Sequence, residues 1–364
     1  MRVVVIGGTG NVGLAVTRAL TADAGTTGVS VVARRHTAAL PSGARMVVAD
    51  VATSDLRPIV AGADAVVHLA WLIQPSRSLD IQWQVNVDGV ARVLAAVADA
   101  GVPTFVAASS VGAYSPRRSL DPVDETWPTH GVATSAYSRQ KAYVERMLDD
   151  FEARHPGVRV ARLRPALIFQ AEAAASQRRY FAGPLLPRAL LRPGVLPIVP
   201  HLSAVHFQAV HADDVADVFV RVLHSDVRGA LNVATDQVLS TRDVADLIGA
   251  RPVHVPFALA RWCIDVAWRL RLHPLEGGWL DLAARCPVLD ATRARTELGW
   301  RPRYDGRAAL RVVLRGIANG AAGPTPPLAA HPIDVQLLDA LRTGMGTRSS
   351  SDLAAREPDS RRPR

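Results

Sequence analysis

Cysteine is scarce in this sequence, with only Cys263 and Cys286 among 364 residues. Two thiols are too few for a disulfide scaffold or a cysteine metal cluster, so we expect both to be buried. Three histidines, His201, His206 and His211, recur at intervals that neither a helix nor a strand brings onto one side. The sequence therefore predicts no metal site.

Long apolar runs are also missing. No stretch reaches the roughly 18 uncharged apolar residues of a membrane helix. The apolar residues 3–6 lead straight into a glycine-rich turn, without the basic flank and cleavage site of a signal peptide. These absences predict a cytoplasmic protein.

Lysine is nearly absent, because Lys141 is the only one and the other basic residues are arginines. The net charge is +9, but the arginines are interleaved with Asp and Glu along the chain and form no basic cluster. We therefore expect no nucleic-acid partner. The single lysine marks a position at which arginine would not serve.

The first twenty residues predict a strand, a glycine turn and a helix. Gly7, Gly10 and Gly13 follow the apolar residues 3–6 at the spacing of a dinucleotide-binding turn. In such a turn the first glycine permits the reversal, the second lets the backbone approach a pyrophosphate, and the third lets the helix pack on the strand. The helix N-terminus then faces the phosphates. We favour this interpretation over a purely structural turn.

The end of a second predicted strand, residues 30–33, bears on the type of dinucleotide. An acid about twenty residues beyond the glycine turn binds the adenosine ribose of NAD, whereas an arginine accommodates the 2′-phosphate of NADP. Arg34 stands there, which favours NADP, although a solvated arginine in this arginine-rich chain would leave NAD open. Asp50, near the end of a third strand at 46–51, is expected to reach the adenine amino group or else to cap a helix after Thr53.

Apolar strands alternate with helical segments along the first half of the chain. Further strands are predicted at 65–70 and 104–108, and a helix from Val85 to about Ala100. This pattern is typical of an α/β fold with a doubly wound parallel sheet. Asn86 lies in the early, buried part of that helix, where an amide needs a specific partner.

A tyrosine and the single lysine share one face of a predicted helix. Tyr137 and Lys141 stand at positions i and i+4. Positive charge from the lysine and from an oxidised nicotinamide is expected to lower the phenol pKa from about 10 toward neutrality, so that Tyr137 can exchange a proton with a carbonyl or alcohol. Ser109 and Ser110 follow the strand at 104–108, where catalytic hydroxyls of open α/β sheets commonly lie.

Together these residues resemble those of the extended short-chain dehydrogenases/reductases, the NAD-dependent epimerase/dehydratase family, over roughly residues 1–320. The resemblance also includes Asp50-Val51, His68-Leu69-Ala70, Asn86-Val87, Leu163-Arg164-Pro165, residues 210–216, residues 231–234, and residues 297–300 followed by Pro302. It implies catalytic roles for Ser110, Tyr137 and Lys141. Ser110 matches better than Ser109 because residues 111–114, Val-Gly-Ala-Tyr, follow it. The implied cofactor site consists of Gly7, Thr9, Gly10, Asn11, Val12, Gly13, Arg34, Asp50, Val51, Leu69, Ala70, Asn86, Tyr137, Lys141 and Pro165.

The resemblance also implies a Rossmann-type domain and a smaller C-terminal substrate lobe. Residues 1–165, with 205–235 returning, make the NAD(P)-binding domain, and residues 166–204 with 236–320 make the lobe. Residues 321–364 are a tail in which only residues 333–341 could form a short helix. We expect disorder from about residue 345 because the composition is rich in Pro, Ala and Ser.

The substrate lobe departs from many family members. Residues 166–170, Ala-Leu-Ile-Phe-Gln, replace the Asn or Tyr-Gly-Pro turn of many nucleotide-sugar enzymes, which argues against such a substrate. Residues 171–200 predict a flexible wall of the substrate cleft. Arg178, Arg179 and Arg188 in this wall are expected on solvated surface or, alternatively, against an anionic substrate.

Two predicted helices complete the lobe. Asp213 and Asp214 are expected to cap one of them. Residues 259–270 are amphipathic, with Leu259, Trp262, Val266 and Leu270 on the apolar side and Arg261, Asp265 and Arg269 as a charge ladder. We expect this helix to cover the substrate cleft in preference to lying on a membrane surface.

The sequence thus predicts an NADP-preferring oxidoreductase acting on a secondary alcohol or ketone of a small, fairly apolar substrate. An epimerase or dehydratase that oxidises its substrate transiently would use the same residues. An NADP-sensing binding protein would need only the dinucleotide site. The substrate is the one partner predicted, and a homodimer is a possible assembly.

Overall fold

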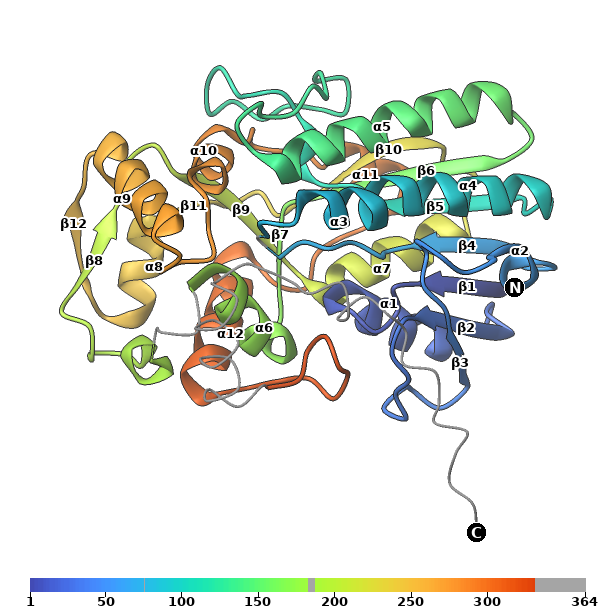
Figure 1. Ribbon diagram of the computed structural model, residues 1–364, viewed down its shortest axis with the longest axis horizontal. Helices are drawn as coiled ribbons and strands as arrows, with labels where there is room; N and C mark the ends of the chain where they lie inside the picture. The colour runs from blue at the N-terminus through green and yellow to red at the C-terminus, as the bar shows by residue number, and fades with distance from the viewer. Residues whose placement is uncertain (75, 183–186, 331–364) are drawn as a thin grey trace, which may run out of the picture.

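The computed structural model describes residues 1–74, 76–182 and 187–330. Seven parallel strands form the central sheet in the order β10-β6-β5-β4-β1-β2-β3 (Figure 1), which confirms the predicted doubly wound fold. The order reverses between β1 and β4, and ligands of such sheets bind outside the carboxyl ends of the strands at this reversal. The strands are β1 (Arg2–Ile6), β2 (Gly28–Ala33), β3 (Ala44–Val48), β4 (Ala65–His68), β5 (Thr104–Ala108), β6 (Arg159–Pro165) and β10 (Gly229–Val233).

Helices cover both faces of the sheet, because its central strands are apolar on both sides. On one face, α1 packs against α7 over a core that includes Val5, Leu20 and Phe219. The other face, which includes Ile6 and Phe105, is covered by α4 and α5. The helices of this domain are α1 (Asn11–Ala22), α2 (Arg57–Val60), α3 (Leu79–Trp83), α4 (Gly89–Asp99), α5 (Ala136–Arg154), α7 (Ala212–Leu223) and α11 (Thr292–Leu298).

The helix predicted from Val85 begins earlier and is not α-helical throughout. α3 runs directly into a π-helical turn, η1 (Gln84–Asp88), and then into α4. The fully buried Asn86 lies in this π turn. Apolar spacing cannot reveal such a turn, because a π turn shifts the helical register by only one residue.

The smaller lobe lies beyond the carboxyl ends of the large sheet, on the left in Figure 1. It contains a three-stranded sheet of β7 (Leu167–Phe169), β9 (His206–His211) and β11 (Val238–Ser240), and a pair formed by β8 (Ile198–His201) and β12 (Arg251–His254). Its helices are α6 (Ala174–Gln177), α8 (Thr241–Ile248), α9 (Phe257–Arg269), α10 (Gly277–Arg285) and α12 (Gly306–Asn319). Between β9 and β11 the chain returns to the large sheet, where β10 pairs with β6.

One segment assigned to the lobe packs instead on the dinucleotide-binding domain. Ala294, Leu298 and Trp300 belong to the core around α7, and the Trp300 indole N–H donates to the carbonyl oxygen of Asp214 at 3.0 Å. The prediction of a lobe spanning all of 236–320 is wrong here. The amphipathic pattern of a helix predicts which of its residues are buried, but not against which domain they pack.

Residues 321–330, predicted as the start of the tail, are packed onto the molecule, and we call them the C-terminal strap. Leu328 is buried against Leu14 and Ala173. The Thr325 hydroxyl donates to the carbonyl oxygen of Thr9 in the glycine turn at 2.8 Å. The predictions for residues 333–341 and 345–364 lie outside the described residues. No described helix has the length and apolar content needed to cross a bilayer.

Candidate active site

The glycine turn is closely packed at two glycines and open at the third. Gly7 has a φ of 85°, and a Cβ there would lie 2.5 Å from the Ala70 nitrogen. A Cβ at Gly13 would lie 2.1 Å from the Gly7 carbonyl oxygen, whereas a Cβ at Gly10 would meet only that oxygen, at 3.5 Å. The turn is therefore packed where it meets β4 and α1 and open at Gly10.

This open side suits the phosphates of a dinucleotide. Gly10 precedes α1, and no side chain caps the helix. The first N–H groups of α1 and its positive dipole end are therefore available to an anion. A backbone surface without a Cβ next to an uncapped helix fits the predicted cofactor.

The residues flanking the turn are held by distant parts of the chain. Gln170 Nε2 donates to the carbonyl oxygen and to Oδ1 of Asn11, both at 2.7 Å. Thr9 accepts the hydrogen bond from Thr325 of the C-terminal strap. Val12 is half-buried against the core. The sequence analysis missed the contributions of Gln170 and Thr325.

The other predicted cofactor residues lie at or just beyond the carboxyl ends of strands. The Leu69 N–H donates to the Ile6 carbonyl oxygen at 2.8 Å, which places Ala70 against Gly7. Pro165 ends β6. Val51 follows β3 and packs closely on Gly89, where a Cβ would come within 2.8 Å of Val51 Cγ2.

Arg34 and Asp50 lie beyond the ends of β2 and β3. Arg34 is half-buried, and its Nη1 is buried without a hydrogen-bond partner in the described part of the chain. Asp50 is buried, and its Oδ1 accepts a hydrogen bond from the Ala52 N–H at 2.9 Å. No helix begins directly after Thr53, because α2 starts at Arg57. Asp50 therefore shapes a turn, and the alternative helix-cap role is wrong.

Ser110 and Tyr137 meet at the end of β5. Ser110 Oγ caps the turn η2 (Val111–Ala113) by accepting the Gly112 N–H at 3.0 Å, and its side chain also hydrogen-bonds the Tyr137 phenol. Ser109 points the other way, because successive residues of a strand face opposite sides. Its Oγ donates to Glu145 at 2.5 Å. The structure thus brings Ser110, and not Ser109, to the tyrosine.

Lys141 lies one turn along α5 from Tyr137. Its Nζ donates to the Ala108 carbonyl oxygen at 2.9 Å and lies 3.5 Å from the centroid of the Trp71 ring. The Trp71 ring also meets Tyr137 edge-on, with centroids 6.0 Å apart. Trp71 therefore links the two predicted catalytic side chains, and no motif in the sequence pointed to it.

The side chains around Tyr137 do not acidify the phenol as predicted. Burial raises the pKa of Tyr137 to about 12, against the opposing effect of the Ser110 hydrogen bond. Burial also lowers the pKa of Lys141 to about 7, against the attraction of Glu145. The prediction considered the positive charges near the phenol but not burial, and desolvation disfavours the charged form of both groups.

Asn86 is bonded within the chain. Its Oδ1 accepts the Leu72 N–H at 2.7 Å, and its Nδ2 donates to the Leu72 carbonyl oxygen at 3.2 Å and to Gln140 Oε1 at 2.8 Å. The buried amide thus has the specific partners that the sequence required. These bonds hold the loop after β4, so the structure places Asn86 in a supporting position behind the predicted dinucleotide site.

His68 is a buried polar residue whose chemistry the sequence analysis did not consider. Both ring nitrogens are buried and have no hydrogen-bond partner among the described residues. Burial, aided by the charge of Lys141, lowers the pKa of His68 to about 3. The imidazole at the end of β4 is therefore neutral at physiological pH.

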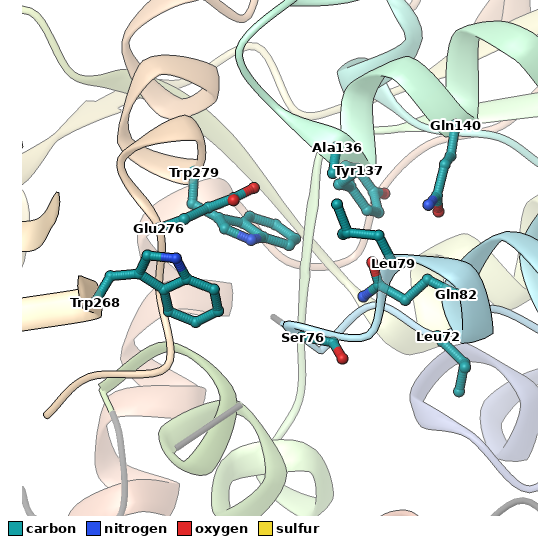
Figure 2. A pocket seen from close by; sticks show the side chains of 10 residues that line it. All are labelled: Leu72, Ser76, Leu79, Gln82, Ala136, Tyr137, Gln140, Trp268, Glu276 and Trp279. Atoms are coloured by element: carbon teal, nitrogen blue, oxygen red, sulfur yellow. The ribbon is translucent and has the colours of Figure 1, made fainter. Parts of the chain in front are cut away.

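A small cavity opens beside Tyr137 (Figure 2). Trp268 of α9 and Trp279 of α10 face Tyr137 and Leu79 across it, and the Trp279 ring lies 5.1 Å from the Tyr137 ring. The only charged side chain in its lining is Glu276, whose pKa is raised by burial. The lining comprises Leu72, Ser76, Leu79, Gln82, Ala136, Tyr137, Gln140, Trp268, Glu276 and Trp279.

A buried ion cluster supports α5 behind the site. Glu145 accepts hydrogen bonds from Arg164 Nε at 2.9 Å and Nη2 at 2.8 Å, from Arg162 Nη1 at 3.3 Å, and from Ser109. Arg164 also donates to the Tyr114 hydroxyl at 2.9 Å. Although burial opposes it, these donors and charges lower the pKa of Glu145 to about 2. The cluster fixes Ser109, and with it the turn that carries Ser110.

Several other predicted features have different surroundings from those expected. His211, and not an aspartate, caps α7, because its Nδ1 accepts the Asp213 N–H at 3.2 Å. Asp214 is buried and accepts the N–H groups of Arg303 and Tyr304. Cys263 is exposed, so the prediction that it is buried is wrong.

Two further predictions concern charged and metal-ligating groups. Among the described residues, no group of three His, Cys, Asp or Glu side chains could hold a metal ion. Arg178, Arg179 and Arg188 do not line the cavity. Burial and the charges of its two neighbours lower the pKa of Arg178.

Comparisons with known proteins identify the family of this chain. The family model described as "NAD dependent epimerase/dehydratase family" matches residues 3–234. An uncharacterized protein of Mycobacterium tuberculosis is 28% identical over 315 residues, which are 85% of this chain and 29% of that protein. The chain thus spans less than a third of the length of this relative. The decarboxylating sterol-4-alpha-carboxylate 3-dehydrogenase of Schizosaccharomyces pombe is 35% identical over 106 residues, 29% of this chain and 30% of that enzyme.

Solved structures show the same fold. The UDP-glucose 4-epimerase of Thermus thermophilus, in complex with NAD, superposes with a TM-score of 0.65 at 22% identity, covering 88% of this chain and 100% of that one. The family model covers most of the chain, including the glycine turn, Ser110, Tyr137 and Lys141. The predicted family is thereby confirmed, and this chain belongs to the NAD-dependent epimerase/dehydratase family.

Proposed function

We propose that this chain is an NADP-preferring oxidoreductase that interconverts a secondary alcohol and a ketone on a small, apolar substrate. The observation that carries the proposal is the position of Tyr137, which bonds Ser110, lies one turn from Lys141 and borders an aromatic-lined cavity. When bound, the dinucleotide supplies or accepts the hydride. Gly7, Gly10 and Gly13 with the start of α1 would hold its phosphates.

In this proposal, side chains of the protein carry out the proton transfer. Tyr137 Oη exchanges a proton with the substrate oxygen, and the Ser110 hydroxyl bonds both oxygens. Because its pKa is raised to about 12, the phenol is protonated at neutral pH and is ready to donate to a ketone. The Lys141 ammonium holds the nicotinamide ribose and stabilises the phenolate that forms.

The cavity favours an apolar substrate. Around Tyr137 its walls contain five apolar or aromatic side chains and, among the described residues, no arginine or lysine. The five are Leu72, Leu79, Ala136, Trp268 and Trp279. The local similarity to a sterol dehydrogenase supports the same substrate class.

Arg34 is expected to decide the preference for NADP. Replacing Arg34 by alanine should weaken NADP binding by roughly 10- to 100-fold, because a charge-assisted hydrogen bond to the 2′-phosphate is lost. NAD affinity should change little. Titration of the intrinsic fluorescence with each dinucleotide measures both constants.

The neighbouring exposed Arg35 provides the control for this experiment. Arg35→Ala lowers the net charge equally, so it separates a general charge effect from a specific contact. Equal and unchanged NADP binding in wild type and Arg34→Ala would remove the NADP assignment.

An epimerase or dehydratase is the second candidate function. It is favoured by the family itself and by the fold likeness to a UDP-glucose 4-epimerase. Such an enzyme returns the hydride to the same substrate, so nicotinamide absorbance does not change over many turnovers. Stoichiometric consumption of NADP or NADPH would support the oxidoreductase, and product formation without consumption would support the epimerase.

Gly112 offers a test of how Tyr137 is positioned. A Cβ at this residue would lie 2.8 Å from Tyr137 Cε1, so the ring must shift in Gly112→Ala. A displacement of the order of 1 Å is expected to lower kcat by roughly 100-fold, with dinucleotide affinity retained. Gly157→Ala is the control, because a Cβ there meets nothing within 4 Å. Unchanged kcat in Gly112→Ala would contradict the assigned position of the phenol.

A further inference from the structure

Helix α9 presents its apolar side to the outside of the molecule. Leu259 is 50% exposed, Trp262 62% and Leu270 63%, and no residue of this helix is buried. Trp268 projects from the other side of the helix into the cavity (Figure 2). The helix thus contributes Trp268 to the cavity wall, whereas Leu259, Trp262 and Leu270, on the apolar side named in the prediction, are exposed.

The charges around this side are of one sign. Arg269 and Arg271 are exposed at its end, next to Leu270 and the 57% exposed Leu272. The one acid of the helix, Asp265, is turned inward, where it accepts the Gly277 N–H at 2.9 Å and pairs with Arg261 at 2.6 Å. The outward side therefore combines large apolar groups with positive charge that no acid of α9 neutralises.

We propose that this side of α9 docks on an anionic membrane surface. We call it the α9 face, made of Leu259, Trp262, Leu270, Leu272, Arg269 and Arg271. Trp suits the level of lipid headgroups, leucines enter the boundary of the acyl chains, and arginines attract anionic lipids.

A second copy of this chain fits the α9 face less well. A two-fold contact places the same patch on both partners. It would bring together two copies of Arg269 and Arg271 without an acid on the helix to pair with them. A surface of anionic headgroups supplies the missing negative charge.

Docking would also fix the position of the cavity relative to the membrane surface. Leu259 and Trp268 lie on opposite sides of one helix, so the cavity lies about one helix diameter, roughly 10 Å, from the docked surface. A substrate dissolved in the membrane would have a short path to Tyr137. This consequence rests on the proposed function, whereas docking itself does not.

Vesicle flotation of the full chain tests the proposal. We expect the protein to float with vesicles of phosphatidylcholine containing phosphatidylglycerol, to float less with pure phosphatidylcholine, and to be released by salt. Trp262→Glu and the double change Arg269→Glu with Arg271→Glu should each lower the partition coefficient roughly 10-fold or more.

The control replaces a comparable exposed residue elsewhere. Leu120 is 45% exposed and lies outside the α9 face, so Leu120→Glu should leave flotation unchanged. NADP binding should be the same in all these variants, which shows that they fold and separates this test from that of the reaction. Absence of flotation with anionic vesicles, or equal flotation of Trp262→Glu, would overturn the proposal. So would light scattering that shows a dimer dissociated by Trp262→Glu, because the face would then bind a second copy.

Discussion

Turnover should fall by roughly 10²- to 10⁴-fold when Tyr137 is replaced by phenylalanine, because the substrate oxygen loses its proton donor. The ring that packs on Gly112, Trp71 and Trp279 remains, so the cavity keeps its shape. NADP affinity should therefore stay close to that of wild type. The measurement is kcat with a panel of apolar secondary alcohols and ketones, followed by nicotinamide absorbance, together with a binding titration.

Tyr143→Phe is the matched control, since Tyr143 lies on the same helix but is 49% exposed and does not line the cavity. Tyr143→Phe removes the same hydroxyl group from a residue that lies outside the proposed active site. Full activity of Tyr137→Phe would refute the catalytic role. A protein that binds NADP but converts no substrate in any form would instead match the NADP-sensing alternative. Mass spectrometry of ligands that purify with the protein can narrow the panel.

The free energy of unfolding should fall by about 3–5 kcal/mol when Glu145 is replaced by alanine, because a buried ion pair loses one partner. Arg164 would keep the Tyr114 hydroxyl and the Glu125 carbonyl oxygen but no carboxylate. Arg162 would still pair with Asp149 at 2.6 Å. The loss of stability therefore arises mainly because the charge of Arg164 remains buried without a carboxylate partner. Urea denaturation followed by circular dichroism measures it.

Asp150→Ala on the same helix is the control. Its pair with Arg154 is largely exposed, so no measurable loss of stability is expected. The contribution of Glu145 also has a defined pH range. Because its pKa is lowered from 4.5 to about 2, the stabilisation is complete above pH 4.5 and is lost as the pH falls toward 2. The difference between wild type and Glu145→Ala should therefore shrink below pH 4.5, and a constant difference would contradict the assignment.

Local patterns in the sequence were sufficient for the fold and for the centre of the site. The glycine turn, Tyr137 and Lys141 each lie within a few residues of the strand or helix that positions them, so their spacing predicts where they lie. The choice of Ser110 over Ser109 needed the family resemblance as well. Their catalytic and cofactor-binding roles stay predictions.

The cavity walls could not be predicted in this way. Trp268 and Trp279 reach Tyr137 only because the lobe packs over the carboxyl ends of the strands, and no periodicity specifies that packing. The sequence did contain an indication of the buried acid Glu145. Arg162 and Arg164 stand at alternate positions of a buried strand, and buried arginines on one face require a buried acid. The direction of the pKa shifts was missed because burial is a property of the folded molecule.

The C-terminal strap has a consequence for biosynthesis. Thr325 and Thr9 are 316 positions apart, so the hydrogen bond between them cannot form until Thr325 has been synthesised. At 5–20 residues per second, roughly 15–60 s pass between the synthesis of the glycine turn and the synthesis of Thr325, which hydrogen-bonds to it. A chain terminated before residue 321 would keep every glycine of the turn and still lack the contact that fastens it.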